Sequence, residues 1–340
     1  MTKRREIAQL GEFGLIAELT KDLPLVNPSS VKGVGDDAAV IGLEGDRCLL
    51  LSTDLLMEGI HFDLVYFPLK HLGYKAVVVG ISDILAMNGT PRQITVSIGV
   101  SAKQSVESLQ ELYDGVRAAC VEYGVDLVGG DTSASVTGLA ISVTAVGEVA
   151  RKGIAYRGGA RMNDLICITG DLGSAYLGLH LLEREKRALE GSDNPQPHFE
   201  GYNYLLERQL HPHARTDIIE AMREAALVPT SMIDLSDGLA SDLLHICKSS
   251  SCGARIYLDR LPIARESYSL CEEMNIDPVV AALNGGDDHQ LLFTVPLAAR
   301  EAVMQLGAID IVGHITPAST GVMLTTPDGS DIPITAPGHK

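Results

Sequence analysis

The stretch CLLLSTDLLMEGIHFD, residues 48–63, decides how the chain is read. Its apolar opening predicts a buried strand, and the polar triplet Ser52, Thr53 and Asp54 predicts a turn where that strand ends. A carboxylate in such a turn lies at the edge of a core. Asp54 is therefore the first candidate functional residue.

A strand, an acidic turn and a helix occur in both halves of the chain. Residues 69–89 (LKHLGYKAVVVGISDILAMNG) predict a helix that stops at Gly89 and has an acidic turn within ISDIL. MIDLSDGLASDLLHICKSS, residues 232–250, reads as a strand end, a turn and a helix, whereas VDLVGGDT, residues 125–132, reads as a short strand that runs into a glycine turn. This alternation predicts an α/β or α+β protein.

The remaining elements follow from hydrophobic periodicity and breaker residues. Further strands are expected at 92–101, 138–149, 165–169, 254–262, 289–296, 309–315 and 321–326, and helices at 103–123, 171–182, 201–209 and 215–226. Composition changes near residue 150, where a basic, glycine-rich connector begins. We expect two domains, residues 1–150 and 151–340.

The totals limit the classes of protein that this chain can represent. Its 340 residues are 46% hydrophobic, and its net charge is −17. So acidic a chain is a poor partner for nucleic acid or an anionic membrane surface, and it suits cationic ligands. The six cysteines form no C-x-x-C pair, and no apolar run is long enough to cross a membrane. These features predict reduced thiols and a cytoplasmic location.

Aspartates recur beside glycine, serine or threonine. The positions are Asp36, Asp37, Asp54, Asp83, Asp131, Asp234, Asp237, Asp287 and Asp288. Taken singly, each could be an ordinary turn or cap residue. Gathered at the edge of a core, their charges would repel unless a cation lay between them. Oxygen ligands of this kind suit Mg²⁺, which protein carboxylates commonly share with a substrate phosphate. The GVGDD loop would then hold a phosphate through the metal.

Sequence motifs of other phosphate-using and hydrolytic enzymes are absent. The chain has no G-x-x-x-x-G-K-[ST], no H-R-D with D-F-G and no G-x-S-x-G. The acids also argue against a dinucleotide-binding loop, because a pyrophosphate would meet bare negative charge there. The candidate functional groups in the sequence are therefore carboxylates, and neither a nucleophile motif nor a phosphate-binding loop with a lysine is present.

Eight segments, in order, resemble thiamine-monophosphate kinase. They are GEFGLIAEL, GVGDDAAVI, STDLLMEGIHFD, ISDILAMNGTPRQ, LVGGDT, DLICITGDLGSAYLGL, IDLSDGLASDLLHI and GGDDHQLLFT. The likeness runs from about residue 11 to about residue 294. The wider superfamily includes aminoimidazole ribonucleotide synthetase, selenophosphate synthetase and a hydrogenase maturation protein. Selenophosphate synthetase has a cysteine or selenocysteine with a lysine near its start, and this chain lacks that pair. The chain also lacks the C-terminal cysteine of the hydrogenase maturation protein.

The resemblance implies an aminoimidazole ribonucleotide synthetase-like fold. Its N-terminal domain would pair across a two-fold axis into a dimeric β-barrel, its C-terminal domain would be α/β, and ATP would bind between the domains. It implies transfer of the γ-phosphoryl group of ATP to thiamine monophosphate, with several Mg²⁺ ions, in a homodimer. The implied metal ligands are Asp37, Ser52, Thr53, Asp54, Asp83, Asp131, Asp234 and Asp237. The implied ATP contacts are Tyr113, Gly130, Asp131, Arg157 and Ser236, and the implied substrate contacts are His61 and Asp287.

Two features depart from the family pattern. The family usually has Glu-Asp-Tyr-Glu after the paired glycines, and this chain has Asp287, Asp288, His289 and Gln290. Asp287 is one methylene shorter than glutamate. The family also usually ends in a glycine and an aromatic residue, where this chain has Gly338 and His339. Both departures bear on recognition of the thiamine.

The expected chemistry needs no general base. A phosphate acceptor is largely ionised at neutral pH, and phosphoryl transfer depends mainly on positioning and on neutralisation of charge. Two alternatives remain at this point. One is another ATP-dependent enzyme of the superfamily, such as a ribonucleotide cyclase. The other is an acidic, metal-stabilised binding protein without catalysis.

Overall fold

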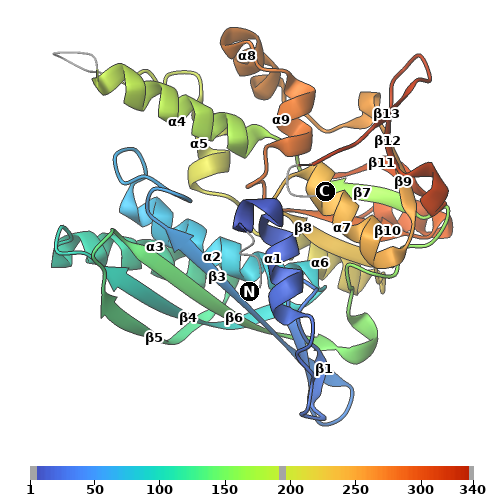
Figure 1. Cartoon of the computed structure of the whole chain (residues 1–340), viewed down its shortest axis with the longest axis horizontal. Coiled ribbons are helices and arrows are strands. Elements are labelled where there is room, and N and C mark those ends of the chain that lie inside the picture. Colours follow the sequence, from blue (N-terminus) through green and yellow to red (C-terminus); the bar gives the residue numbers. More distant parts are fainter. Residues whose placement is uncertain (1–5, 191–196, 337–340) are drawn as a thin grey trace, which may run out of the picture.

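Two sheets, each covered by helices, organise the chain (Figure 1). The structure is a computed structural model that describes residues 6–190 and 197–336. The first sheet contains β1 (Ser30–Lys32), β2 (Ala39–Gly42), β3 (Arg47–Met57), β4 (Thr90–Val100), β5 (Asp126–Ala134) and β6 (Ala140–Ala150). The second contains β7 (Leu165–Thr169), β8 (Ser231–Leu235), β9 (Gly253–Tyr257), β10 (Gln290–Val295), β11 (Ile309–Thr316), β12 (Val322–Thr325) and β13 (Asp331–Pro333).

The described residues form ten α-helices. They are α1 (Gly11–Thr20), α2 (Leu69–Ala86), α3 (Val106–Tyr123), α4 (Ser174–Glu190), α5 (Asn203–Leu210), α6 (Thr216–Glu224), α7 (Leu239–Ser250), α8 (Arg265–Met274), α9 (Pro278–Asn284) and α10 (Arg300–Met304). Six of these ten described helices, α2 to α7, correspond to helices expected from the sequence, whereas α1, α8, α9 and α10 were not predicted. Helix α3 shows why the boundaries fall where they do. The side chain of Ser105 accepts a hydrogen bond from the amide of Ser108, and Gly124 ends the helix at a φ of 62°.

The first sheet has the order β1-β2-β3-β6-β4-β5, and all its pairs are antiparallel except β4 with β5. Alternate residues point to opposite faces. Ile141, Val143 and Ala145 are buried on the face that α2 and α3 cover, as the alternation predicted. The register places Leu55 on the opposite face, where its side chain is 55% exposed. No described helix covers that second face.

Helix α2 lies at the centre of the molecule. It packs against β3, β4 and β6 of the first sheet and also against β8 of the second. Its contact with α3 is very close, because a Cβ atom at Gly73 would lie 1.9 Å from the carbonyl oxygen of Leu112. A Cβ atom at Gly115 would lie 1.8 Å from the carbonyl oxygen of Lys70. Glycine is required at both positions because the two backbones meet there.

The second sheet has the order β13-β12-β9-β11-β7-β10-β8 and is antiparallel except for the pair β9 and β12. Met232 and Phe293 on one of its faces belong to the same hydrophobic core as Ile81 and Ile84 of α2. The core is therefore continuous between the sheets, and burial of apolar surface holds them in one arrangement. Any residue on α2 has a fixed position relative to both sheets.

Three local expectations were wrong. Strand β3 continues through Ser52, Thr53 and Asp54 to Met57, so the polar triplet is not a turn. Strand β5 continues through its two glycines, because a Cβ atom at Gly130 would meet the carbonyl oxygen of Val96 at 1.9 Å. That glycine serves a close approach between strands. Asp83 lies inside α2 and not in a turn.

The described part of the chain forms no closed barrel, since the first sheet ends in two free edges, β1 and β5. The mixed α/β class is confirmed. All six cysteines are free thiols, as expected. Among the described residues, no helix is both long and apolar enough to span a membrane.

Candidate active site

Three carboxylates from separate parts of the chain meet at one point. One oxygen each of Asp37, Asp83 and Asp234 lies within 4.8 Å of the other two. Asp37 comes from the loop before β2, Asp83 from α2 and Asp234 from β8. The sequence analysis named all three as candidate metal ligands, and the fold brings them together because α2 lies between the sheets.

Hydroxyl groups link these acids to neighbouring elements. The hydroxyl of Ser52 donates to Asp83, and that of Ser82 donates to Oδ2 of Asp234 over 2.7 Å. Asp54 lies two residues after Ser52, on the same face of β3. Of the predicted ligands, Ser52 and Asp54 therefore join the three-carboxylate cluster. We call Asp37, Asp54, Asp83 and Asp234 the carboxylate cluster.

The cluster carries more negative charge than its own surroundings neutralise. Burial raises the pKa of Asp37 to about 7, against the pull of Arg157, and Asp234 adds to the rise. Burial and then repulsion from Asp234 raise the pKa of Asp54 to about 6. Burial, followed by repulsion from its three neighbours in the cluster, holds the pKa of Asp83 well above its ordinary value. A cation among these groups would restore their ordinary ionisation.

The donor set fits a hard divalent cation. Oδ2 of Asp37 and Oδ2 of Asp54 are buried, and neither accepts a hydrogen bond from a described residue. Buried polar atoms are rarely left without a partner. Carboxylate and hydroxyl oxygens at several positions are the ligands that Mg²⁺ takes in proteins, usually together with water and phosphate. The cluster can hold such an ion, and a phosphate can approach through it.

Arg157 contacts the cluster from the connector between the sheets. Its Nε and Nη2 atoms lie 3.0 and 2.6 Å from Oδ1 of Asp37, and its amide donates to Asp36 over 2.9 Å. Burial alone would lower the pKa of Arg157, but Asp37 and the other acids raise it, so the guanidinium stays charged. The predicted ATP contact thus lies beside a predicted metal ligand.

The turn between β8 and α7 carries Ser236 and Asp237, both exposed next to the cluster. Asp242, one turn further into α7, was missed by the sequence analysis. Its side chain is buried, its Oδ2 has no partner among the described residues, and burial followed by repulsion from Asp237 and Asp234 raises its pKa. The signal for it was an acid in an otherwise apolar stripe of the helix, between Leu239 and Ile246.

The two acids of the GGDD turn point to different places. Asp287 contacts Lys75 of α2 and Nε2 of His289. Asp288 accepts from the amide of Gly173 over 2.9 Å and so lies at the start of α4. Of the two, only Asp287 lies near the cluster, since His289 is 3.8 Å from Asp234.

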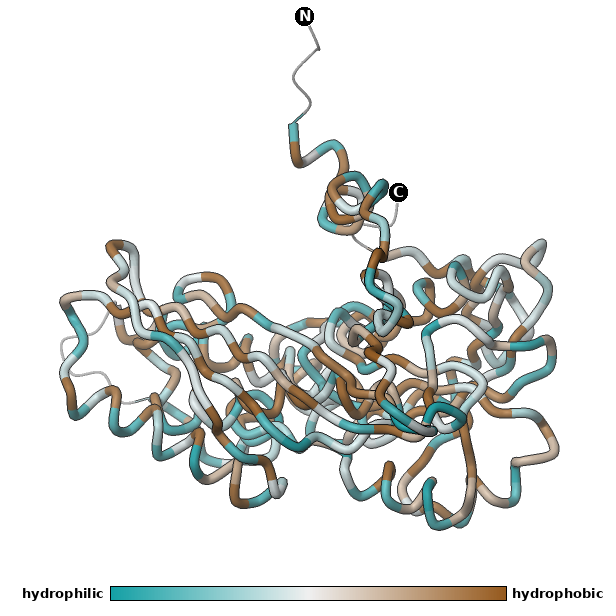
Figure 2. The backbone as a smooth tube through the Cα atoms, turned by 90° about the horizontal axis from the view of Figure 1, so that it is seen from below, coloured by the Kyte–Doolittle hydropathy of each residue, from teal (hydrophilic) through white to brown (hydrophobic). Residues whose placement is uncertain are grey.

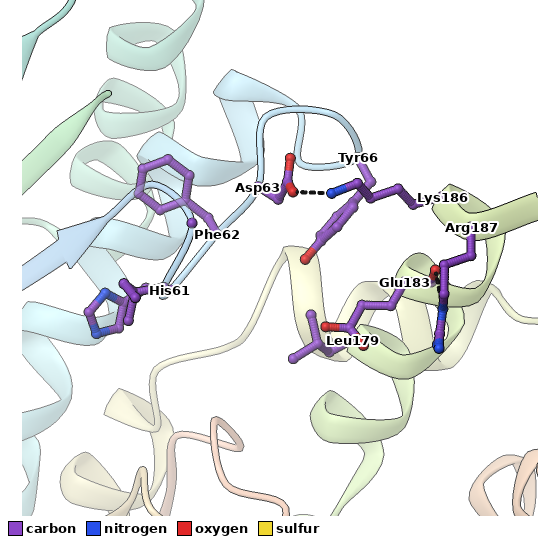
Figure 3. A pocket seen from close by; sticks show the side chains of 10 residues that line it. His61, Phe62, Asp63, Tyr66, Leu179, Glu183, Lys186 and Arg187 are labelled. Carbon is purple, nitrogen blue, oxygen red and sulfur yellow. Dashed lines mark hydrogen bonds and ion pairs between the residues drawn. The ribbon is translucent and has the colours of Figure 1, made fainter. Parts of the chain in front are cut away.

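His61 lines a pocket of about 380 Å³ between the loop after β3 and helix α4 (Figure 3). Its Nδ1 accepts a hydrogen bond from the amide of Met57 over 2.9 Å. Across the pocket, Lys186 of α4 forms an ion pair with Asp63 at 2.6 Å. No member of the carboxylate cluster lines this pocket. It is polar and partly closed by side chains from both segments.

Three predicted residues lie on the other side of the first sheet or at its edge. The register β3-β6-β4-β5 aligns Leu55, Ser142, Ser97 and Asp131, so Asp131 points to the uncovered face. It is three strands from Asp54, about 14 Å at the usual strand spacing. Thr53 also points to that face, where its hydroxyl lies 3.1 Å from that of Thr144. Tyr113 lines a groove of about 530 Å³ beside β5.

Within this one chain, then, Thr53, Tyr113, Gly130 and Asp131 are not gathered at the carboxylate cluster. Their predicted roles stay predictions. Gly338 and His339, which stand where the family has its C-terminal glycine and aromatic residue, lie outside the described residues.

Known proteins define the class to which this fold and site belong. A model of the N-terminal domain of AIR synthase related proteins matches residues 35–149, and a model of their C-terminal domain matches residues 163–322. The chain therefore has the two domains of an AIR synthase related protein. Several hydrogenase maturation proteins named HypE share the fold at 18–23% identity.

The more similar relatives carry one name. Thiamine-monophosphate kinase of Aquifex aeolicus is 36% identical over 85% of this chain and 87% of its own length, and that of Bacillus subtilis is 33% identical over 87% of both. The solved structure of AaThiL complexed with AMPPCP and TMP has a TM-score of 0.82 and 32% identity, and it covers 98% of this chain and 97% of its own. The chain belongs to the thiamine-monophosphate kinase family.

Proposed function

We propose that this protein transfers the γ-phosphoryl group of ATP to thiamine monophosphate and so produces thiamine diphosphate. The carboxylate cluster carries the proposal, in a chain that aligns over most of its length with thiamine-monophosphate kinases. A structural relative with 32% identity holds AMPPCP, an analogue of ATP, together with TMP. A buried group of acids with unsatisfied oxygens is what a reaction between two anions requires.

The residues act by position and charge. The acceptor phosphate is itself the nucleophile and is largely ionised near neutral pH, so no side chain has to remove a proton. When bound, Mg²⁺ would neutralise the charge that develops on the transferred group. Asp37, Asp54, Asp83 and Asp234 would hold it, and Arg157 would add a cation at the same place. Holding both phosphates in line supplies the rest of the rate enhancement.

We further propose several Mg²⁺ ions at this site, because the eight candidate ligands exceed what one ion binds from protein. We take the exposed turn with Ser236 and Asp237 as the ATP site and the region of His61 and Asp287 as the substrate site. All strands of the first sheet come before residue 151, and all strands of the second sheet come after it, which supports domains 1–150 and 151–340.

Free thiols at all six cysteines support a cytoplasmic location.

We also propose a homodimer. The uncovered face of the first sheet exposes the apolar side chains of Leu51, Leu55 and Met57. Helix α1 exposes Ile16 and Leu19, and Figure 2 shows the N-terminal helical segment standing away from the sheets. Apolar surface of this extent on a protein in water commonly marks an interface. A second copy that packs its own sheet on this face would close the barrel that one chain leaves open.

A product assay tests the proposed function. Purified protein is incubated with ATP, Mg²⁺ and thiamine monophosphate, and thiamine diphosphate and ADP are separated and quantified by chromatography. We expect equal amounts of both products, none with EDTA, and recovery when Mg²⁺ is added back. ADP formation only with an acyclic amidine ribonucleotide, which a cyclase would close to an aminoimidazole ring, would favour a cyclase. Binding of both ligands without ADP would favour a protein that only binds.

A further inference from the structure

A buried lysine lies next to Asp287, the carboxylate that we propose contacts the substrate. Lys75 of α2 is 3% exposed, its ammonium group forms an ion pair with Oδ2 of Asp287, and it donates to the carbonyl oxygen of Gln209 over 3.1 Å. The same group lies 5.7 Å from the centre of the Phe67 ring. A buried ammonium is costly unless it is paired, so this contact has to be maintained by the surrounding fold.

The turn that carries Asp287 is held in an unusual backbone conformation. Asp287 and His289 have φ values of 63° and 49°, which residues other than glycine adopt rarely. The amide of Asp287 donates to the carbonyl of Ser236 over 2.7 Å, and that of His289 donates to Leu235 over 2.9 Å. Strain of this kind persists where the surroundings impose it, often at functional sites. The turn is therefore fixed to the β8–α7 turn.

Both oxygens of Asp287 have a partner, yet its side chain remains open to the site. Oδ2 contacts Lys75, and Oδ1 lies 3.0 Å from Nε2 of His289. Lys75 and His289 are each 3% exposed, whereas the Asp287 side chain is 37% exposed. Carboxylate oxygens have two lone pairs each, so acceptor capacity remains on the exposed side. The neighbouring Asp288 has no such arrangement, because it is buried at the start of α4.

We propose that Lys75 is a positioning residue that, with His289, fixes the Asp287 carboxylate to recognise the cationic thiamine part of the substrate. This inference rests on the proposed function. Lys75 and His289 hold the carboxylate from its buried side, and acceptor positions remain on its exposed side. His289 also lies between the carboxylate and the cluster, since its Nδ1 is 3.8 Å from Oδ2 of Asp234. The backbone hydrogen bonds from Asp287 to Ser236 and from His289 to Leu235 place substrate recognition beside the strand that carries Asp234.

The test is a kinetic cycle with Lys75→Met, Asp287→Asn and the double variant. KM for thiamine monophosphate is measured at saturating ATP, and KM for ATP at saturating thiamine monophosphate. Loss of an interaction with a charged group predicts a rise in the first KM of roughly 10–100-fold in each single variant. KM for ATP should stay within about twofold. The double variant should be no worse than Asp287→Asn, because Lys75 acts only through Asp287.

Lys70→Met is the matched control, because Lys70 is exposed on the same helix. It should behave as the parent protein does. If Lys75→Met does not fold, two other variants replace it: the double variant, which removes both charges, and His289→Gln. His289→Gln should also raise KM for thiamine monophosphate. An unchanged KM for thiamine monophosphate in the variants, or effects that multiply in the double variant, would overturn the positioning role alone. A parent protein that forms no thiamine diphosphate would overturn the proposed function as well.

Discussion

At the scale of single residues, Asp54 combines a functional position with a cost in stability. Its Oδ2 is buried without a partner among the described residues, and burial, followed by repulsion from Asp234, raises its pKa. Asp54→Asn removes that repulsion. We expect the free energy of unfolding of the metal-free protein to rise on the order of 1–2 kcal/mol near pH 8. Turnover should nearly vanish, because a cluster ligand is lost. Thermal melting in EDTA and the product assay measure the two effects.

The matched control for this variant is Asp114→Asn, an exposed acid on α3 that forms an ion pair with Arg117 at 2.9 Å. It should change neither activity nor melting by a measurable amount, because exposed ion pairs contribute little. A stable Asp54→Asn protein with normal turnover would contradict the assignment of Asp54 to the metal site.

The cluster also predicts how stability depends on pH. The pKa of Asp37 is about 7 in the folded protein against 3.8 for an ordinary aspartate, so the folded state binds its proton more tightly than the unfolded chain. The metal-free protein therefore loses stability as the pH rises from about 4 to about 7, and then levels off. Protons compete with Mg²⁺ for the same oxygens. The increase in melting temperature caused by Mg²⁺ should thus be larger at about pH 8 than at about pH 6.

Scanning fluorimetry with saturating Mg²⁺ or with EDTA, at several pH values, measures this difference. A variant that carries both Asp37→Asn and Asp54→Asn should show a much smaller dependence on pH and on Mg²⁺. A Mg²⁺ effect that is equal at all pH values in the parent protein would argue that the metal binds elsewhere.

At the scale of elements, the contact between α2 and α3 determines where Lys75 and Asp83 lie. Gly73→Ala would place a methyl group 1.9 Å from the carbonyl oxygen of Leu112, so the two helices must separate. Overpacking of this kind costs about 1–3 kcal/mol or more. We expect a lower melting temperature and a lower midpoint of urea unfolding. The loss of activity should be larger than the change in stability explains, because α2 carries site residues.

A substitution on the exposed face of α3, Ala118→Ser, provides the comparison for Gly73→Ala. It should lower stability by no more than about 0.5 kcal/mol. If Gly73→Ala melts and turns over like the parent protein, the close approach of the two backbones is not a constraint in solution.

Strand β5 shows what limits the prediction of an element from its sequence. Glycine has two different uses, a turn with positive φ or a close approach between backbones, and the letters do not distinguish them. In VDLVGGDT the second use applies at Gly130, which can be seen only when β4 lies beside it. The predicted end of strand β3 was also too early, because a polar triplet inside a strand resembles the turn that ends one. Helices α2, α3 and α7 were predicted well because their apolar periodicity is local.

At the scale of the whole molecule, the sequence predicted the mixed α/β class and the family. It could not predict that α2 packs on both sheets, because that contact joins residues far apart in the chain, such as Ser82 and Asp234. The same contact assembles the cluster. The acids Asp37, Asp83 and Asp234 could be named from their motifs, whereas Asp242 was hidden in a helix and Lys75 in an apolar run.

The position of Asp131 leads to a prediction about the assembly. Within one chain it points away from the face that carries Asp54 and lies three strands from it, so both can serve one site only if Asp131 reaches the site of a second copy. We expect Asp54→Asn and Asp131→Asn to be inactive as homodimers. A mixed dimer of the two, isolated through two different tags, contains one site with both acids intact and should recover about half of the parent activity. If Asp131 acts within its own chain, each site of the mixed dimer lacks one acid, and the activity stays absent.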